Sequence, residues 1–340
     1  MASSVVIQTS FLGDTILTTP LLAQLAHRGP VDVVTTPAAA SVLTGHPSVR
    51  SVIVYDKRGA HAGLFGLTTL AARLRAATYE TAFLAQGSLR SAALAFVARI
   101  PERIGFATSA GSWLYTTKVA YRDDLHHAAR LLLLSRPNGR EPTAEETRPS
   151  LAPGSAEREL VDNLLRRDGV TAGERLIALA PGSVWATKRW PYYRELAQEL
   201  ARDGRIVIVG GPDDSALALE IRTAVPDAVD ATGALPLLGS AELIARCAVI
   251  VTNDSSPLHL ASAMGTPTVA IFGPTVPDFG FGPLAPSSVV VGHGSLTCRP
   301  CHRHGPRRCP LKHFRCMREL TAEGVAERTR TLILSPDARA

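Results

Sequence analysis

Residues 249–272 have the sequence VIVTNDSSPLHLASAMGTPTVAIF, and this stretch indicates how the chain folds. Val249–Thr252 and Val269–Phe272 are short, β-branched apolar runs, which are typical of buried strands. Pro257–Met264, between them, has the length and composition of a helix. A strand, a helix and a second strand in this order predict a parallel sheet covered by helices.

The same alternation continues through most of the chain, with short apolar runs separated by longer helical patterns. It predicts further strands at Val5–Gln8, Val31–Thr35, Val52–Tyr55, Thr81–Leu84, Leu176–Ala180 and Ile206–Val209. It predicts further helices at Thr15–Ala26, Ala38–Thr44, Leu64–Ala76, Ala156–Arg167, Tyr192–Arg202, Asp214–Ala224, Ala241–Arg246 and Thr321–Leu334. Ser91–Ala98 and Arg103–Gly105 continue the alternation.

Between Pro137 and Pro153 the alternation gives way to a stretch rich in proline, threonine and charged residues, which predicts a linker. It separates two doubly wound α/β domains, residues 1–153 and 154–340, and a length of 340 residues suits two domains. Ligands bind beyond the carboxyl ends of the strands in such sheets. We therefore expect the functional site in the cleft between the domains.

The composition limits the class of protein. Hydrophobic residues make up 46% and charged residues 19%, which excludes a disordered or fibrous chain. The formal net charge of +6 permits phosphate-rich ligands, anionic membranes or nucleic acid. The first fourteen residues lack the basic and apolar regions of a signal peptide, and no apolar run reaches about eighteen residues. We therefore expect a cytoplasmic protein without a transmembrane helix.

The first candidate motif, Phe11-Leu12-Gly13-Asp14-Thr15, follows the first predicted strand. Gly13 permits a tight turn or the close approach of a ligand. Asp14 is a candidate catalytic carboxylate, and it is equally suited to cap a helix. The Gly-x-Gly-x-x-Gly pattern of dinucleotide-binding sites is absent from this segment.

The second candidate motif, residues 180–191, has the sequence APGSVWATKRWP and joins a buried strand to a helix. Its glycine, the hydroxyl groups of Ser183 and Thr187, and the ammonium group of Lys188 are suited to bind a phosphate. It lacks the pattern of a P-loop. The alternative is a surface loop anchored by two tryptophans.

The third candidate motif, residues 252–259, has the sequence TNDSSPLH and leads into a helix capped near Ser255 or Ser256. The free amides at the start of such a helix suit a diphosphate. Asp254 would repel a phosphate, so we interpret it as a local cap or as a group that orients a ribose or the loop. The alternative is a well-capped helix with a partly buried His259.

The fourth candidate motif contains four of the five cysteines within nineteen residues, namely Cys298, Cys301, Cys309 and Cys316. Their density favours a metal knuckle over a disulfide framework. The spacing of the first pair suits chelation, and four thiolates suit zinc or iron. With four protein ligands, such a metal would be structural. Nearby His302, His304 and His313 are alternative ligands, and the alternative to a metal site is a set of reduced thiols.

Taken together, these motifs resemble glycosyltransferase family nine, the ADP-heptose:lipopolysaccharide heptosyltransferases, and most closely the second type. The resemblance rests on residues 8–20 (QTSFLGDTILTTP), 182–191, 253–265 and 272–275, in that order along the chain. It implies a GT-B fold of two Rossmann-like domains, with the acceptor in residues 1–153 and the nucleotide sugar in residues 154–340. The implied reaction is an inverting transfer of L-glycero-D-manno-heptose from ADP-heptose to the lipopolysaccharide inner core.

The resemblance also implies roles for single residues. Asp14 matches the general base that acts on the acceptor hydroxyl, and Lys188 matches the lysine that binds the phosphates. Ser256 stands where the family often has glycine. The implied ADP-heptose ligands are Gly13, Ser183, Thr187, Lys188, Asp254, Ser255, Ser256 and His259.

We expect transfer without a catalytic metal or other cofactor, because Lys188 and the helix after Asp254 would offset the charge of the leaving ADP. The lipid A–core acceptor carries anionic groups, and the net positive charge favours loose contact with the inner leaflet of the inner membrane. Candidate acceptor ligands, which are otherwise solvated surface charges, are Lys57, Arg58, Arg90 and Arg103.

Three alternatives stay open at this point. The chain could use another acceptor, such as a protein or a small metabolite, or another nucleotide-sugar donor. It could also be a sugar-nucleotide epimerase of the same fold. A basic nucleic-acid binder with a metal knuckle is disfavoured, because aromatic residues make up only 5% of the chain and no basic stripe is visible.

Overall fold

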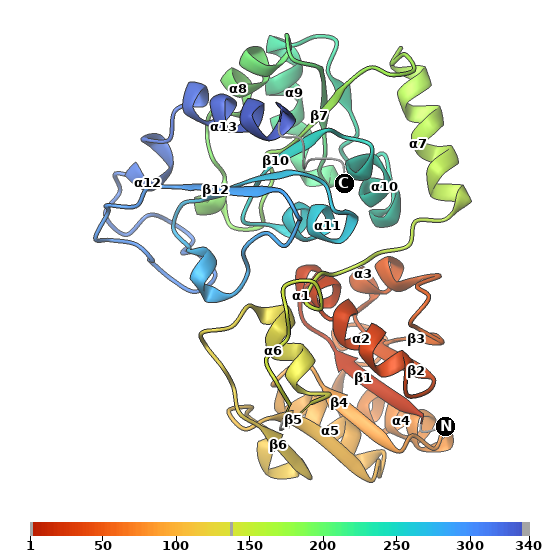
Figure 1. Ribbon diagram of the computed structural model, residues 1–340. Coiled ribbons are helices and arrows are strands. Elements are labelled where there is room, and N and C mark those ends of the chain that lie inside the picture. The colour runs from red at the N-terminus through yellow and green to blue at the C-terminus, as the bar shows by residue number, and fades with distance from the viewer. Residues whose placement is uncertain (1–2, 137–138, 335–340) are drawn as a thin grey trace. The chain divides into compact units, whose positions relative to one another are not determined.

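The computed structural model of the chain describes residues 3–136 and 139–334. The chain divides into two compact units, residues 1–152 and 153–340. Each unit is built on one six-stranded sheet with helices on both faces (Figure 1). All pairings within both sheets are parallel. The predicted α/β class with two doubly wound parallel sheets is therefore confirmed.

The N-terminal unit has the strand order β3-β2-β1-β4-β5-β6. Its strands are β1 (Ser4–Gln8), β2 (Val31–Thr35), β3 (Ser51–Val54), β4 (Thr81–Leu84), β5 (Glu102–Phe106) and β6 (Thr117–Val119). Its helices are α1 (Leu12–Leu17), α2 (Thr19–Ala26), α3 (Pro37–Ala40), α4 (Gly63–Ala76), α5 (Leu89–Val97) and α6 (His127–Leu133). Two 3-10 turns complete it, η1 (Ser41–Leu43) and η2 (Ser112–Leu114).

The C-terminal unit has the strand order β12-β11-β10-β7-β8-β9. Its strands are β7 (Leu176–Ala180), β8 (Arg205–Ile208), β9 (Val229–Asp230), β10 (Val249–Asn253), β11 (Thr268–Phe272) and β12 (Ser288–Gly292). Its helices are α7 (Ser155–Arg167), α8 (Tyr193–Leu200), α9 (Ser215–Ala224), α10 (Leu237–Ala245), α11 (Ser256–Met264), α12 (Arg315–Arg318) and α13 (Ala322–Leu334). Its 3-10 turns are η3 (Ala186–Lys188), η4 (Pro212–Asp214) and η5 (Pro277–Phe279).

The strand order of each sheet reverses beside its first strand. β1 lies between β2 and β4, and β7 lies between β10 and β8. In the register of β7 with β10, Ala180 lies opposite Thr252, so the segments that follow both strands leave the sheet side by side. Doubly wound sheets bind their ligands at the carboxyl edge beside such a reversal. The first three candidate motifs all begin at this position in their sheets.

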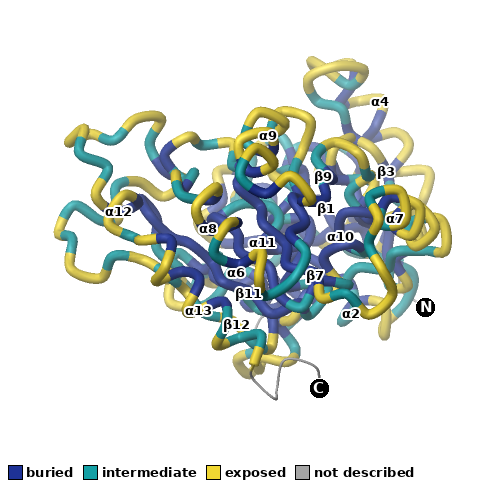
Figure 2. Tube along the Cα trace, turned by 90° about the horizontal axis from the view of Figure 1, so that it is seen from above, coloured by how far each residue is buried: buried dark blue, intermediate teal, exposed yellow. Residues whose placement is uncertain are grey.

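The central strands form the cores of the two units. Every residue of β2, β7, β10 and β11 is buried, and the buried runs follow the strands in Figure 2. Continuous apolar strands of this kind are expected where helices cover both faces of a parallel sheet. Within the described residues, no helix combines the length and the apolar character needed to cross a membrane.

The helix predicted at Thr15–Ala26 is in fact two helices, α1 and α2, which meet at Thr18. Pro20 lies in the first turn of α2, where its missing amide proton is tolerated, whereas within one long helix it would break the hydrogen-bond ladder. The hydroxyl of Thr18 donates to the carbonyl of Asp14 at 2.7 Å and satisfies an acceptor at the end of α1. The break leaves Asp14 on a helix of six residues.

The segment predicted as a linker is held against the N-terminal unit along the part that the structure describes. Residues 137–138, at its start, lie outside the described residues. Glu146 accepts a hydrogen bond from Arg136 at 3.0 Å, and the amide of Ser150 donates to the Thr19 hydroxyl at 3.0 Å. The segment is therefore packed chain rather than a free tether.

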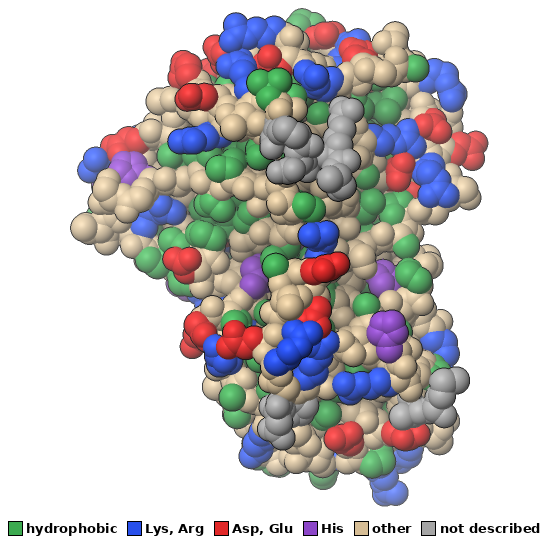
Figure 3. Space-filling model, in the orientation of Figure 1, with side chains coloured by type: hydrophobic (Ala, Val, Ile, Leu, Met, Phe, Trp, Pro, Cys, Tyr) green, Lys and Arg blue, Asp and Glu red, His purple; other side chains and the backbone are tan. Residues whose placement is uncertain are grey.

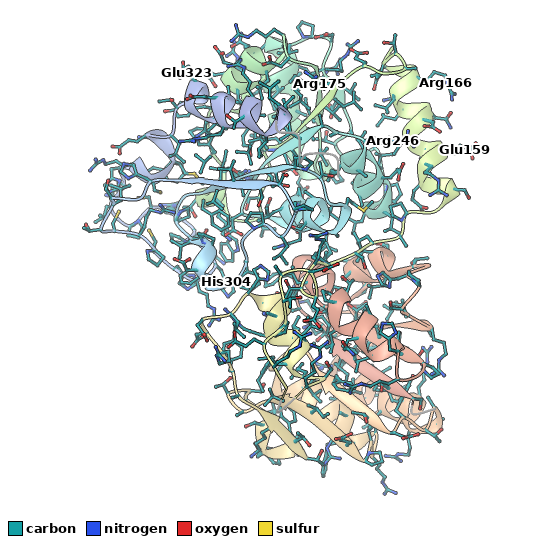
Figure 4. The ribbon with its side chains drawn as sticks, in the orientation of Figure 1. Glu159, Arg166, Arg175, Arg246, His304 and Glu323 are labelled. Carbon is teal, nitrogen blue, oxygen red and sulfur yellow. The ribbon has the colours of Figure 1, made fainter. Side chains whose placement is uncertain are left out.

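In the C-terminal unit, Arg246 connects α7 and α10 through hydrogen bonds and an ion pair. It follows the end of α10, where its guanidinium donates to Glu242 of the same helix at 2.8 Å. The guanidinium also pairs with Asp162 and donates to the carbonyl of Arg158, both on α7. Figure 4 labels Arg246, and Glu159 and Arg166 mark α7. One arginine thus bonds to acceptors on two helices and holds α7 against α10.

The positive charge of the chain is dispersed on the face of the molecule shown in Figure 3. Lys and Arg side chains there alternate with Asp and Glu over both units and do not form one basic stripe. Many of the cations are paired, as Arg122 is with Asp124 and Glu141. This distribution gives no support to a nucleic-acid groove on that face.

Candidate functional site

Asp14 lies where the chain leaves β1 and enters α1. It is the third residue of the helix, and its Oδ2 accepts the amide proton of the N-cap residue Phe11 at 3.2 Å. Its side chain is only 15% exposed. Asp14 therefore caps the helix, as the sequence allowed. The cap uses Oδ2 and does not involve Oδ1.

The second oxygen of Asp14 faces a histidine that the sequence did not point to. Nε2 of His127, the first residue of α6, lies 3.5 Å from Oδ1 of Asp14. The sequence analysis predicted no helix in this region. Asp123 and Asp124, shortly before the largely apolar run of residues 128–134, were the available signal, because acidic residues are typical of helix starts.

Three of the proposed acceptor cations follow strands β3 and β4 at the carboxyl edge that also carries Asp14. The ammonium group of Lys57 donates to the carbonyl of Thr9 at 2.7 Å, which fixes Lys57 beside the turn after β1. Burial lowers the pKa of Lys57, and the neighbouring charges of Arg58 and Arg90 lower it further. Arg90 donates to the hydroxyl of Tyr55 at 2.5 Å. The structure therefore groups Lys57, Arg58 and Arg90.

Arg103, the fourth proposed acceptor cation, lies elsewhere. It is the second residue of β5, near the amino edge of the sheet. Its guanidinium donates to the carbonyls of Leu114 at 2.8 Å, Ile100 at 2.5 Å and Pro101 at 3.2 Å. These three carbonyls belong to segments at the amino edge of the sheet, whereas doubly wound sheets bind their ligands at the carboxyl edge. We therefore leave Arg103 out of the acceptor site.

In the C-terminal unit, Lys188 and Asp254 form a buried ion pair. Nζ of Lys188 lies 2.6 Å from Oδ2 of Asp254, and each side chain is 11% exposed. The hydroxyl of Thr275 donates to the same oxygen at 2.7 Å. The lysine and the aspartate belong to separate sequence motifs, and their contact shows that Asp254 holds the ammonium group of Lys188 in place.

The loop that carries Lys188 is anchored by Asn253. The Asn253 side chain is fully buried at the end of β10. Its amide nitrogen donates to the carbonyl of Pro181 at 2.8 Å, and its amide oxygen accepts the backbone proton of Trp190 at 3.2 Å. One side chain thus holds both ends of the candidate phosphate loop. Sequence reasoning did not assign Asn253 a role.

The two hydroxyl residues of this loop have different surroundings. The hydroxyl of Thr187, which is buried, donates to the carbonyl of Pro306. Ser183 contributes its backbone carbonyl to Arg189 at 2.8 Å. The backbone of the loop is therefore held by its own side chains, and Thr187 also ties it to the cysteine-rich segment.

Helix α11 begins where the sequence predicted, but without a side-chain cap. Ser255 is its N-cap and Ser256 its first residue, and no described side chain caps its amides. His259 is buried, with its ring edge-on to Phe281 at 6.4 Å between centroids. A helix of nine residues with uncapped amides, beside the Lys188–Asp254 pair, presents hydrogen-bond donors to an anion.

The expected metal site at the cysteines is not supported. Among residues 3–136 and 139–334, no group of three or more His, Cys, Asp and Glu side chains is placed to hold a metal ion. Cys316 is buried in the apolar core of the C-terminal unit, and the thiol of Cys301 points to the carbonyl of Cys298 at 3.2 Å. Burial raises the pKa of both thiols, for Cys316 to about 11. Spacing alone had suggested that Cys298, Cys301, Cys309 and Cys316 converge on one ion.

The chain is similar to one protein family and to several known proteins. The model of glycosyltransferase family 9 (heptosyltransferase) matches residues 67–312. Lipopolysaccharide heptosyltransferase 2 of Salmonella typhimurium is 30% identical over 290 residues, which cover 81% of this chain and 83% of that protein.

Two solved structures are similar over almost their full length. The ADP-heptose lipopolysaccharide heptosyltransferase II of Escherichia coli has a TM-score of 0.78 at 24% identity and covers 98% of this chain and 99% of its own. A family 9 glycosyltransferase of Veillonella parvula has a TM-score of 0.85 at 24% identity and covers 98% of this chain and 97% of its own. The GT-B fold is confirmed by these likenesses.

The anchoring role of Asn253 leads to a stability prediction. We expect Asn253→Ala to lower the free energy of unfolding by about 2–3 kcal/mol, because it leaves the buried Trp190 amide and Pro181 carbonyl without their partner. In thermal unfolding, the midpoint should fall by about 5–10 °C. The exposed Asn163→Ala is the matched control and should shift the midpoint by less than about 2 °C. Equal shifts for the two variants would refute the anchoring role.

Proposed function

Because the chain belongs to glycosyltransferase family 9, we propose that it transfers a heptose from ADP-heptose to the inner core of lipopolysaccharide. The family match over residues 67–312 carries this proposal. The acceptor class is supported by the Salmonella heptosyltransferase, which is similar over 81% of this chain and 83% of its own length. The donor is supported by the Escherichia coli structure.

We further propose that residues 1–153 bind the acceptor and residues 154–340 bind the nucleotide sugar. The Lys57, Arg58 and Arg90 group suits the anionic sugars of a lipid A–core acceptor. The uncapped amides of α11 and the ammonium group of Lys188 suit the diphosphate of ADP. Each unit thus offers the cations that its proposed ligand requires, at the carboxyl edge of its own sheet.

Asp14 is the proposed general base. In a single inverting displacement, the acceptor oxygen forms a bond to the anomeric carbon while the bond from that carbon to the phosphate oxygen breaks. The electron pair leaves with ADP, and the hydroxyl proton passes to Oδ1 of Asp14, because Oδ2 is held by the Phe11 amide. A carboxylate is a weak base, so its effect depends on its position beside the hydroxyl.

Lys188 and α11 are proposed to stabilise the leaving ADP. Lys188 has three ammonium protons, and its bond to Asp254 uses one of them. The others are available to phosphate oxygens, together with the first amides of α11. These groups supply positive charge where negative charge develops, so we propose that catalysis requires no divalent metal.

Substitution of Asp14 and of Lys188 tests these roles separately. We expect Asp14→Asn to lower kcat about 100- to 10,000-fold while ADP still raises the melting temperature. Lys188→Ala should raise the KM for ADP-heptose and weaken stabilisation by ADP, because it removes a charged hydrogen-bond donor. The loss of one such donor should weaken the affinity for ADP by a factor of about 10–100. Initial rates and thermal unfolding with ADP measure both effects.

The exposed Asp213→Asn and Lys118→Ala are the matched controls and should behave as the unmodified chain. Turnover close to normal in Asp14→Asn would remove Asp14 as the base. UDP or GDP stabilising the chain where ADP does not would favour another donor. Loss of activity in a chelator, restored by magnesium, would contradict transfer without a metal.

We also propose peripheral contact with the anionic inner leaflet, made by the start of α4. Leu64 and Phe65 in its first turn are 82% and 84% exposed, so two adjacent large apolar side chains face solvent. Residues 57–79 contain two lysine or arginine residues before this turn and two on α4, with no acidic residue. Apolar side chains beside cations are the combination that binds an anionic lipid surface.

Cosedimentation with vesicles of phosphatidylglycerol and phosphatidylethanolamine tests this contact. The double variant Leu64→Ser, Phe65→Ser should bind at least about tenfold more weakly, because two apolar side chains no longer enter the lipid. The control Leu219→Ser removes a leucine that is 66% exposed on the other unit. Identical binding by the double variant and the control would rule out α4 as the contact.

A further inference from the structure

The carboxylate of Asp14 has a neighbour on each oxygen, and the two neighbours come from different helices. Oδ2 accepts the Phe11 amide at 3.2 Å, within α1 itself. Oδ1 lies 3.5 Å from Nε2 of His127, which lies on α6 and far from Asp14 in the sequence. The two side chains are 15% and 13% exposed, so water screens their interaction only partly.

His127 is held in place by the packing of α6. This helix contacts α1 and α2. Arg130, one turn after His127, is 1% exposed and donates to the hydroxyl of Tyr121 at 2.7 Å and to the carbonyl of Asp123 at 3.0 Å. The ring of His126 accepts the amide proton of Ala128 at 3.2 Å and caps the helix. The position of His127 is therefore set by an anchored helix, unlike that of a freely rotating surface side chain.

We propose that His127 is a positioning residue for Asp14, which holds the Oδ1 side of the carboxylate toward the acceptor hydroxyl. The inference rests on the proposed function, in which Asp14 is the base. Without His127, the Phe11 amide alone would hold the carboxylate, which could then rotate about its last side-chain bond. The distance of 3.5 Å is long for a hydrogen bond, and such contacts commonly tighten in the reacting complex.

The role of His127 is confined to orientation. In the transfer step, the hydroxyl proton passes to Asp14, the new bond forms at the anomeric carbon, and ADP leaves with the electron pair. His127 exchanges no atom with the substrates. Its removal should therefore lower kcat and leave the KM for ADP-heptose unchanged, because the proposed donor ligands Lys188 and α11 belong to the other unit.

Variants of His127 separate orientation from a merely structural role. We expect His127→Ala to lower kcat about 10- to 100-fold, as a misplaced catalytic group does. His127→Gln, whose amide nitrogen occupies the place of Nε2, should stay within about fivefold of the unmodified chain, whereas the ring-shaped but apolar His127→Phe should resemble alanine. Leu133→Ala, buried on the same helix, is the control for stability and should lower the melting temperature without lowering kcat.

A double-mutant cycle with Asp14→Asn distinguishes failure of this inference from failure of the proposed function. If His127 acts through Asp14, the double variant Asp14→Asn, His127→Ala should have the kcat of Asp14→Asn within about twofold. An inactive Asp14→Asn with a fully active His127→Ala would overturn the role of His127 alone. The same fold loss from His127→Ala in both backgrounds would also overturn it. A fully active Asp14→Asn would overturn the base and its positioning residue together.

Discussion

The constraint on which this structure depends is that both sheets are entirely parallel. A parallel strand can be followed by its neighbour only after a crossover connection, so every strand in a sheet ends at the same edge. Asp14, Lys57 and Arg90, which are far apart in sequence, therefore share one edge of the N-terminal unit. Lys188 and Asp254 share the corresponding edge of the C-terminal unit. The reversal of strand order beside β1 and β7 leaves a place for a ligand at each edge.

Polar groups at these edges are buried and satisfied by one another. Asn253 bonds both ends of the candidate phosphate loop, and Asp254 holds Lys188 and Thr275. Each of these bonds gives a buried polar atom a partner, which favours this arrangement over one that leaves the atom without a bond. The Asp14 carboxylate likewise has a neighbour on each oxygen, the Phe11 amide and the His127 ring. The proposed chemistry thus uses side chains that are already oriented before a ligand binds.

The sequence predicted the central elements well, because buried parallel strands are continuous apolar runs. β1, β7 and β10 were found within a residue or so of their observed bounds. Strands β6, β9 and β12 were missed. They are short or half-exposed strands at the sheet edges, and β12 alternates between exposed and half-buried residues. Their apolar signal is correspondingly weak.

The site was predicted in part for a similar reason. Motifs at strand ends pointed to Asp14, Lys188 and Asp254, but local sequence does not contain contacts between distant segments. The pairing of Lys188 with Asp254, and of Asp14 with His127, depends on how elements pack. Arg103 was misplaced because its position within β5, rather than its charge, decides which edge it occupies.

The central claim is that this chain joins a heptose from ADP-heptose to a lipopolysaccharide core. Mass spectrometry of the products formed from ADP-heptose and a heptose-deficient core acceptor tests it most directly. The account predicts that the acceptor gains the mass of one heptose residue, with one ADP released for each transfer and with inversion at the anomeric carbon. An unchanged acceptor with active enzyme, or a gain in mass from a UDP-sugar and none from ADP-heptose, would contradict it.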